Sequence, residues 1–277
     1  MIQVHEIGYT YKDGSCALNN ISLDLNKGNV IGLIGSNGAG KSTLFLNIMG
    51  ILRPDRGKIH YKGAPIQYRK NFLQSYRNQV GIVFQNPDRQ IFFSNVYDDI
   101  AFALRNANLD EHTIKERIQS VLSMMNLQAI SNKPVHLLSY GQKKRVSIAG
   151  VLAMEGEVLL FDEPSAGLEP GMKQEMADII LTLRNKGKKI VVSSHDMDFI
   201  YRISDYIYLI HQGKNALEGP PHQVFSSEEN IQSFGLDTPW LVKMHHYMGI
   251  PLFKTDQELL DYCKTNDFLL IDDKNRL

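Results

Sequence analysis

The sequence predicts an α/β fold with a mixed β core, an inserted α-helical subdomain and a short C-terminal helical extension. Short β-branched apolar runs alternate with longer segments of helical periodicity, which is typical of a mostly parallel sheet covered by helices. One of these runs leads into a glycine-rich loop and then into a helix. At 277 residues, the chain is long enough for one large domain or one domain with an appendage.

The expected elements follow in order along the chain. Residues 1–4 begin a strand, and the apolar run 30–34 precedes the glycine-rich loop and a helical pattern at 44–49. Further buried strands are expected at 80–84, 158–161 and 190–192. Helical periodicity is present at 114–125 and again after Pro170, a residue that suits the first turn of a helix.

These elements suggest three parts. Residues 1–225 form the main domain, and the stretch from about 86 to 153, which lacks strand patterns, forms the helical subdomain inserted into it. Residues 226–277 form the extension, where capping-box patterns at Ser226 and Thr255 predict two short helices. The extension carries more apolar surface than it can bury on itself, so it must pack against the main domain or a partner subunit.

Composition argues against several classes of function. Thirty basic residues balance thirty acidic ones, so charge gives no argument for binding nucleic acid or an anionic membrane surface. Cys16 and Cys263 lie far apart without metal-ligand spacing, which favours reduced thiols over a disulfide or a zinc site. No apolar run is long enough to span a bilayer, so a membrane process would need another chain for the spanning.

The glycine-rich loop has the pattern of a phosphate-binding loop. Glycines let the backbone wrap an anion, the helix N-terminus directs N–H groups at it, and Lys41 adds a full charge. The Ser42 hydroxyl would bind a Mg²⁺ ion bridging the terminal phosphates. The alternative is a glycine-rich turn with a chance lysine. The expected nucleotide-binding residues of this loop are Gly35, Ser36, Asn37, Gly38, Ala39, Gly40, Lys41, Ser42 and Thr43.

Two consecutive carboxylates end the expected strand at 158–161. Asp162 is placed to hold the Mg²⁺ ion through water, and Glu163 can act as the general base that polarises the attacking water. Because holding a metal needs only one carboxylate, the pair indicates hydrolysis. The alternative is a strand that simply ends in an acidic turn.

A polar segment at 138–145 narrows the prediction of a nucleotide-hydrolysing protein to one family, because it resembles the signature motif of ATP-binding cassette ATPases. The paired carboxylates, a D-loop at 165–170 and the switch residue His195 follow it in the order of that family. Gln85 matches the family's glutamine loop, which implies that it senses Mg²⁺, and Tyr11 matches the aromatic residue that stacks on adenine. We expect Tyr9 on the other face of the same strand.

The resemblance covers residues 1–225 and implies that ATP and Mg²⁺ bind between two subunits. Ser139 and Gly141 of one subunit, with Gln142 beside them, would then face the γ-phosphate held by Lys41 of the other. The residues alone support this in part, since Ser139 is a good N-cap and a helix N-terminus can bind an anion. An ordinary capped helix remains the alternative for this motif.

Three positions carry open questions within the resemblance. Tyr140 stands where the family most often has glycine, and its bulky ring would alter how tightly the dimer closes. Glu169 replaces the usual aspartate, which keeps the charge on a longer arm and would alter communication between the two sites. His195 would contact the γ-phosphate and order the water and Glu163, unless it is an ordinary histidine at a strand end.

The region around Gln85, Gln90, Phe92 and Phe93 resembles the ATPases of energy-coupling-factor importers, and residues 142–154 resemble their cobalt-importing branch. This implies a peripheral ATPase on the cytoplasmic side of the cell membrane. Its expected partners are a second ATPase subunit, identical or related, a membrane coupling protein and a substrate-binding membrane protein, with no nucleic acid. The extension would then serve in dimerisation. Alternatively, Phe92 and Phe93 belong to the core of the helical subdomain.

Other functions fit the sequence less well. Asn132-Lys133 is not followed by the aspartate of a guanine reader, and a small-molecule kinase would leave the signature and the carboxylate pair unexplained. A soluble cassette ATPase outside transport would show a long heptad insertion or a second cassette, and neither is present. Among transporters, the alternative to a cobalt importer is a vitamin or nickel importer of the same kind.

Overall fold

The computed structural model of the chain describes residues 1–266. The strands are β1 (Ile2–Thr10), β2 (Cys16–Asp24), β3 (Val30–Ile34), β4 (Arg56–Tyr61), β5 (Ala64–Pro65), β6 (Val80–Val83), β7 (Val158–Asp162), β8 (Lys189–Ser193), β9 (Tyr206–His211) and β10 (Lys214–Gly219). The helices are α1 (Lys41–Ile48), α2 (Lys70–Gln79), α3 (Val96–Asn106), α4 (Glu111–Met124), α5 (Tyr140–Ala153), α6 (Pro170–Asn185), α7 (Met197–Ile203), α8 (Pro221–Val224), α9 (Glu228–Ser233), α10 (Trp240–Met248) and α11 (Asp256–Thr265). Single turns of 3-10 helix lie at Leu25–Lys27, Pro87–Arg89, Gln128–Ile130 and Val135–Leu137.

Two sheets form the core. The larger sheet has the order β10-β9-β3-β8-β7-β6, in which the five strands from β9 to β6 run parallel and β10 pairs antiparallel with β9. The second sheet is antiparallel, with the order β2-β1-β4-β5. The expected mixed β core is therefore confirmed. The separate antiparallel sheet is a feature that the sequence analysis did not foresee.

The larger sheet is buried on both faces. Val30 and Ile34 of β3 belong to a core shared with helices α3 to α7, whereas Ile31 and Leu33 belong to a second core shared with α1 and the antiparallel sheet. Because successive strand residues point to opposite faces, a strand with two buried faces has to be apolar throughout. This explains why the strands β3, β6, β7 and β8 are nearly continuous apolar runs.

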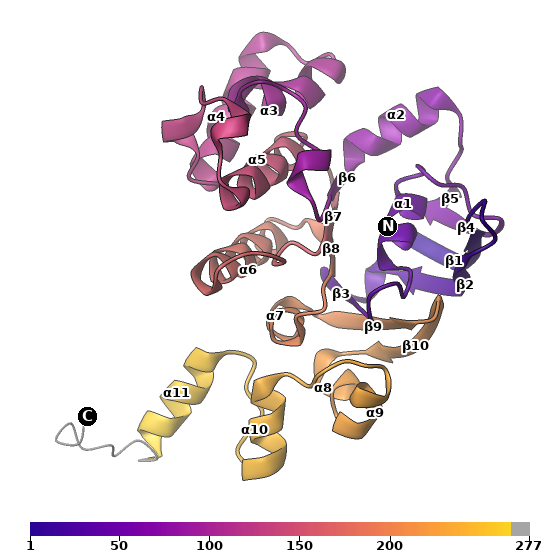
Figure 1. Cartoon of the computed structure of the whole chain (residues 1–277), viewed down its shortest axis with the longest axis vertical. Coiled ribbons are helices and arrows are strands. Elements are labelled where there is room, and N and C mark those ends of the chain that lie inside the picture. Colours follow the sequence, from indigo (N-terminus) through magenta and orange to yellow (C-terminus); the bar gives the residue numbers. More distant parts are fainter. Residues whose placement is uncertain (267–277) are drawn as a thin grey trace.

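The segment between β6 and β7 is helical. Helices α3, α4 and α5 pack together at the end of the larger sheet away from β10, as Figure 1 shows. In this fully described segment, the one β feature is a single bridge between Asn95 and Pro134. Helix α5 contacts β6 directly, so the subdomain is joined to the sheet by α5.

The C-terminal part is more helical than expected. Helix α9 is capped by Ser227, one residue later than the capping box at Ser226 predicts, and α11 is capped by Thr255 as expected. Helix α10 was not predicted, so the expectation of two helices in the extension was wrong. The reason is visible at α10, which follows Pro239 and has no side-chain cap for a capping rule to detect. Residues 267–277 lie outside the described part.

The described helices, from α1 to α11, are all too short or too polar to cross a lipid bilayer.

Candidate active site

The loop between β3 and α1 opens onto a cavity of about 410 Å³. Gly38 and Gly40 have φ angles of +79° and +108°, which L-residues rarely adopt, and a Cβ on Gly40 would lie 2.5 Å from the Ala17 carbonyl oxygen. Helix α1 begins at Lys41 without a side-chain cap, so its first N–H groups remain available for an anion. The cavity is lined by Tyr11, Ser15, Cys16, Ala17, Asn37, Gly38, Ala39, Gly40, Lys41, Ser42, Thr43, Gln85, Asp162 and Glu163.

Lys41 is buried at this cavity. Its Nζ donates to the carbonyl oxygens of Gly35 at 2.6 Å and Ser36 at 3.1 Å, which holds the side chain along the loop. Burial lowers the pKa of Lys41, while the nearby charges of Glu163 and Asp162 oppose this shift. The structure therefore brings the cation of the loop and both carboxylates together, although the sequence separates them by about 120 positions.

Ser193 at the end of the neighbouring strand β8 fixes the Asp162 carboxylate and the Glu163 backbone. The Ser193 hydroxyl donates to Asp162 Oδ1 at 2.6 Å, and the Glu163 N–H is bonded to the Ser193 carbonyl oxygen at 3.1 Å. Glu163 has a φ angle of +49°, a rare conformation for a residue with a side chain. Ser193 was not predicted as a site residue, because a serine at a strand end carries no motif of its own.

His195 contacts Glu163 directly. The imidazole Nδ1 lies 2.9 Å from Glu163 Oε2, with Glu163 buried and His195 largely exposed. Glu163 lines the cavity, whereas His195 is not among the lining residues. The expected ordering of Glu163 by His195 agrees with this contact, and contact between His195 and a phosphate stays a prediction.

Tyr11 lies at the mouth of the same cavity. Its hydroxyl is 2.9 Å from Thr43 Oγ1, and its ring is half-exposed, as a platform for a base would require. Tyr9 does not lie on the opposite face of the strand as expected, because its ring meets the Tyr11 ring edge-on at a centroid distance of 5.1 Å. The expectation was wrong because residues two apart in a strand point to the same face.

The signature residues Ser139, Gly141 and Gln142 do not line this cavity. They form a capping box at the start of α5, in which the Ser139 hydroxyl accepts from the Gln142 N–H at 3.3 Å and Gln142 Oε1 accepts from the Ser139 N–H at 3.1 Å. The capping box fits an ordinary capped helix. It also fits a phosphate site between two subunits, because the start of α5 would then meet a nucleotide bound by the second subunit.

Tyr140 joins three of the motifs. Its hydroxyl donates to the Gln85 carbonyl oxygen at 3.3 Å, and its ring packs over Gly167 of the D-loop, where a Cβ would lie 3.1 Å from the ring. The large side chain is therefore accommodated within one subunit. Glu169 is the N-cap residue of α6 but makes no side-chain capping bond.

Lys144 was missed by the sequence analysis although it lies beside the site. Its side chain is fully buried, and its Nζ contacts carbonyl oxygens next to the cavity, at Gln85 and Glu163. Burial lowers the pKa of Lys144 to about 8. It stands in the run Lys143-Lys144-Arg145, and such runs of charge are usually solvent-exposed, so no pattern in the sequence marked it.

The donors around the cavity fit a magnesium nucleotide. Glycine backbone, helix N–H groups and Lys41 suit phosphate oxygens, and Ser42, Gln85 and Asp162 offer oxygen ligands that suit Mg²⁺. Within residues 1–266 there is no cluster of three His, Cys, Asp or Glu side chains that could hold a metal ion. Mg²⁺ is typically held by one or two carboxylates together with substrate phosphates and waters, which fits Asp162 beside a bound nucleotide.

A second hollow of about 240 Å³, called the groove below, lies between β6, α3 and α5 and is lined in part by Gln90, Phe92, Phe102 and Val151. Phe92 is 74% exposed, so it does not belong to the core. Docking of a partner at this surface stays a prediction, and of its four expected residues Gln90 and Phe92 line the groove. Gln85 lines the nucleotide cavity instead, and Phe93 packs beside Phe102 without lining the groove.

Gln90 connects the groove to the sheet. Its Oε1 accepts from the Phe84 N–H at 3.1 Å, and its Nε2 donates to the Ser147 carbonyl oxygen of α5 at 3.0 Å. Asp99 shapes the rim by accepting the N–H groups of Phe92 and Phe93, and burial raises the pKa of Asp99. Phe84 lies next to Gln85, so the groove and the nucleotide cavity share one short segment.

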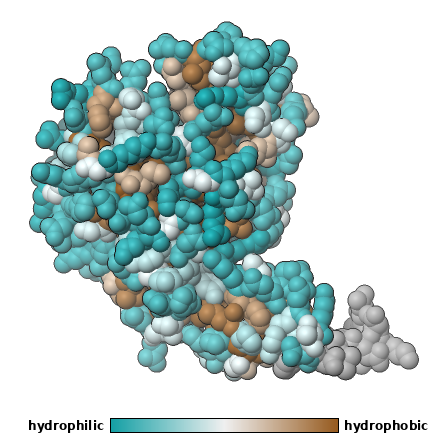
Figure 2. All heavy atoms as spheres, turned by 180° about the vertical axis from the view of Figure 1, so that it is seen from behind, coloured by the Kyte–Doolittle hydropathy of each residue, from teal (hydrophilic) through white to brown (hydrophobic). Residues whose placement is uncertain are grey.

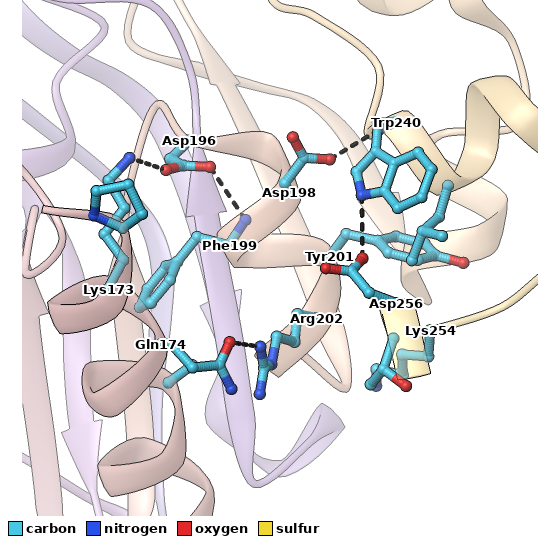
Figure 3. Close-up of a pocket in the computed structure, with 14 residues that line it drawn as sticks. Lys173, Gln174, Asp196, Asp198, Phe199, Tyr201, Arg202, Trp240, Lys254 and Asp256 are labelled. Atoms are coloured by element: carbon cyan, nitrogen blue, oxygen red, sulfur yellow. Dashed lines mark hydrogen bonds and ion pairs between the residues drawn. The ribbon is translucent and has the colours of Figure 1, made fainter. Parts of the chain in front are cut away.

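The extension is fastened to the segment that follows His195 (Figure 3). Asp196 caps helix α7 and pairs with Lys173 of α6 at 2.7 Å, and Asp198 accepts the backbone N–H of Trp240 at 2.7 Å. The indole of Trp240 donates in turn to Asp256 at 3.1 Å. These residues surround a cavity of about 340 Å³, and most of its polar side chains are hydrogen-bonded within the protein, so it offers few free groups to a ligand.

Comparison with known proteins gives a consistent result. The family model described as "ABC transporter" matches residues 18–166. The cobalt import ATP-binding protein CbiO of Salmonella paratyphi A is 42% identical over 258 residues, which cover 93% of this chain and 95% of that protein. The energy-coupling factor transporter ATP-binding protein EcfA of Methanocaldococcus jannaschii is 42% identical over 239 residues, which cover 86% of each chain.

A solved structure shows the same arrangement. It is cbiO1 from Clostridium perfringens, described as part of the ABC transporter complex cbiONQ, with 39% identity and a TM-score of 0.76 over 90% of this chain and 98% of that chain. The expected fold and the resemblance drawn from the motifs are confirmed by these similarities.

Proposed function

Because the chain belongs to the ABC transporter family, whose ATP-binding subunits hydrolyse ATP, we propose that it energises cobalt import through an energy-coupling-factor transporter. The observation that carries hydrolysis is the single cavity that combines Lys41 and Ser42 of the phosphate loop with Asp162 and Glu163. A protein that only bound the nucleotide would have no use for the second carboxylate at this position.

The main residues at and beside the cavity each have a definite task in this proposal. Lys41 and the N–H groups of α1 bind and orient the terminal phosphates, and Tyr11 stacks on the adenine. Asp162, Ser42 and Gln85 hold Mg²⁺, which when bound neutralises phosphate charge. Glu163 accepts the proton of the attacking water, and His195, bonded to Glu163, holds this carboxylate in position.

The site requires a second ATPase subunit, identical or related. Ser139 and Gly141 lie away from the cavity of their own chain, so the γ-phosphate held by Lys41 would meet these residues from the partner. The apolar side chains exposed on the extension, among them Tyr247 and Met248, would contribute to this pairing. Figure 2 shows apolar side chains gathered over the extension in the lower part of the view.

The groove would receive a helix of the membrane coupling protein. It is lined by exposed aromatic and aliphatic side chains, and the charge on its rim is limited to a few residues such as Arg77 and Asp99. Docking there would hold the chain at the cytoplasmic side of the membrane. Gln90 and Phe84 link the groove to Gln85, which would couple docking to the state of the nucleotide.

The proposal of cobalt as cargo rests on the 42% identity with CbiO. The test is uptake of radiolabelled Co²⁺ by cells that carry the complete transporter with this chain as its ATPase, compared with cells that carry Glu163→Gln. We expect uptake of Co²⁺ with the parent chain and a large loss with the variant. Uptake of Ni²⁺ or of a labelled vitamin in place of Co²⁺ would contradict the proposal that cobalt is the cargo, but not the proposal that the chain is the transporter's ATPase.

A further inference from the structure

Lys144 is the one lysine of helix α5 that faces the interior. Its side chain is fully buried, whereas its neighbours Lys143 and Arg145 reach outward and form ion pairs with Asp88 and Glu175. Buried lysines are rare in folded proteins because an ammonium group loses its hydration when it leaves water. The position therefore calls for a reason, and the chemistry described above gives Lys144 no role.

The ammonium group of Lys144 lies where three segments meet. Its Nζ is 3.3 Å from the Phe84 carbonyl oxygen, 2.8 Å from that of Gln85 and 3.3 Å from that of Glu163. An ammonium group has three donors, so these carbonyl oxygens match its full capacity. Lys144 thus ties α5 to the glutamine loop after β6 and to the backbone of the general base after β7.

The carboxylates near Lys144 also favour its charge. Asp162 and Glu163 oppose the effect of burial on the Lys144 pKa, which burial lowers. An apolar side chain of similar length would fill the same space without the cost of desolvation, as replacements of other buried charges have shown. The contacts that such a side chain could not make are those to Gln85 and Glu163, so we look for the function of Lys144 in these contacts.

We propose that Lys144 is a positioning residue for hydrolysis, which sets the backbone of Gln85 and Glu163 relative to the signature helix α5. This inference rests on the proposed function, in which Ser139 at the start of α5 faces ATP bound by the partner subunit. Lys144 lies five residues after Ser139 on the same helix, so a displacement of α5 by the partner would move the ammonium group and, through its hydrogen bonds, the Glu163 backbone.

The experiment compares Lys144→Met with the matched control Lys143→Met in the full chain. The control removes a lysine from the adjacent position of the same helix, where the side chain reaches Asp88 and not Glu163. ATP affinity and the rate of Mg²⁺-dependent phosphate release are measured for the parent and for both variants. A rate change without an affinity change separates positioning of the base from damage to the binding site.

We expect Lys144→Met to lower kcat by about 10- to 100-fold, because small misplacements of reacting groups cost rates of this order. Its ATP affinity and both constants of Lys143→Met should stay within about twofold of the parent. In a Glu163→Gln background, Lys144→Met should cause little further loss, since its effect acts through the base that is already removed.

Three results would overturn the inference. These are a parent-like kcat in Lys144→Met, a parallel loss of ATP affinity, or an undiminished additional loss in the Glu163→Gln background. Should Lys144→Met fail to fold, Lys144→Gln repeats the comparison, and misfolding of both variants would also overturn the inference by showing that Lys144 serves the fold alone. A parent chain without any hydrolysis would instead contradict the proposed function.

Discussion

Glu163 has a rare backbone conformation, is buried and contacts His195 directly. The sequence predicts that Glu163 belongs to the site, because two adjacent carboxylates after a buried strand form a motif, and its role as the base stays a prediction. The sequence could not predict the φ angle of +49° or the bonds from Ser193, since these depend on how β7 and β8 pair in the sheet. Local patterns reveal the residues of a site, and the packing of distant segments fixes their geometry.

Lys144 illustrates the same limit more sharply. A lysine between two other basic residues looks solvent-exposed in sequence, yet helical geometry turns this side chain inward while Lys143 and Arg145 point outward. The side chain that contacts the backbone of both Gln85 and Glu163 was therefore not recognisable without the structure.

Tyr11 provides a test at the level of one side chain. Base stacking contributes about 1–3 kcal/mol, so Tyr11→Ala should weaken ATP binding by about that amount. Tyr9→Ala is the matched control, because Tyr9 touches Tyr11 edge-on but does not line the cavity. Isothermal titration with a non-hydrolysable ATP analogue measures both variants. A damaging Tyr9→Ala together with a silent Tyr11→Ala would refute the stacking role.

At the scale of elements, the buried strands and amphipathic helices were predictable and the weakly patterned elements were not. The strands β3, β6, β7 and β8 lie within one residue of the predicted runs, because strands buried on both faces are apolar throughout. Helices α2 and α10 were missed, since neither has a side-chain cap at its start. The pairing of β1 with β4 joins segments about 50 residues apart, which no local pattern indicates.

The groove gives a prediction about an element and its partner. Phe92→Glu should leave the chain folded, because Phe92 is 74% exposed, but should abolish pull-down of the membrane coupling protein. Phe102→Glu, at another residue that lines the groove, should have the same effect. Ile51→Glu is the control, since Ile51 is an exposed apolar residue that does not line the groove. Undiminished pull-down by Phe92→Glu would show that the partner docks elsewhere.

At the scale of the whole molecule, the extension packs against the core of its own chain and leaves some apolar side chains exposed to solvent. Ile231, Leu241, Val242 and Leu259 belong to the same buried cluster as the helices of the main domain. Tyr247 and Met248 remain exposed on α10. Of the two possibilities that the sequence left open, packing against the main domain is therefore observed, and pairing with a partner stays a prediction.

That pairing can be tested without removing the extension. Tyr247→Glu combined with Met248→Glu should weaken self-association of the nucleotide-free chain by about tenfold or more, a loss of about 1.4 kcal/mol. ATP binding should be unchanged, because both residues lie far in sequence from the cavity and do not line it. Analytical ultracentrifugation measures the association. An association constant equal to that of the parent would assign the extension to the fold of one chain.

The central claim is that the cavity hydrolyses ATP with Glu163 as its base, and phosphate release by the purified chain tests it most directly. With Mg²⁺ and ATP, the parent should turn over, and chelation of Mg²⁺ should stop it. Lys41→Ala should lose nucleotide binding, whereas Glu163→Gln should bind ATP normally and release phosphate about 10²- to 10⁴-fold more slowly. Phosphate release by Glu163→Gln at the rate of the parent would contradict the account, because another group would then activate the water.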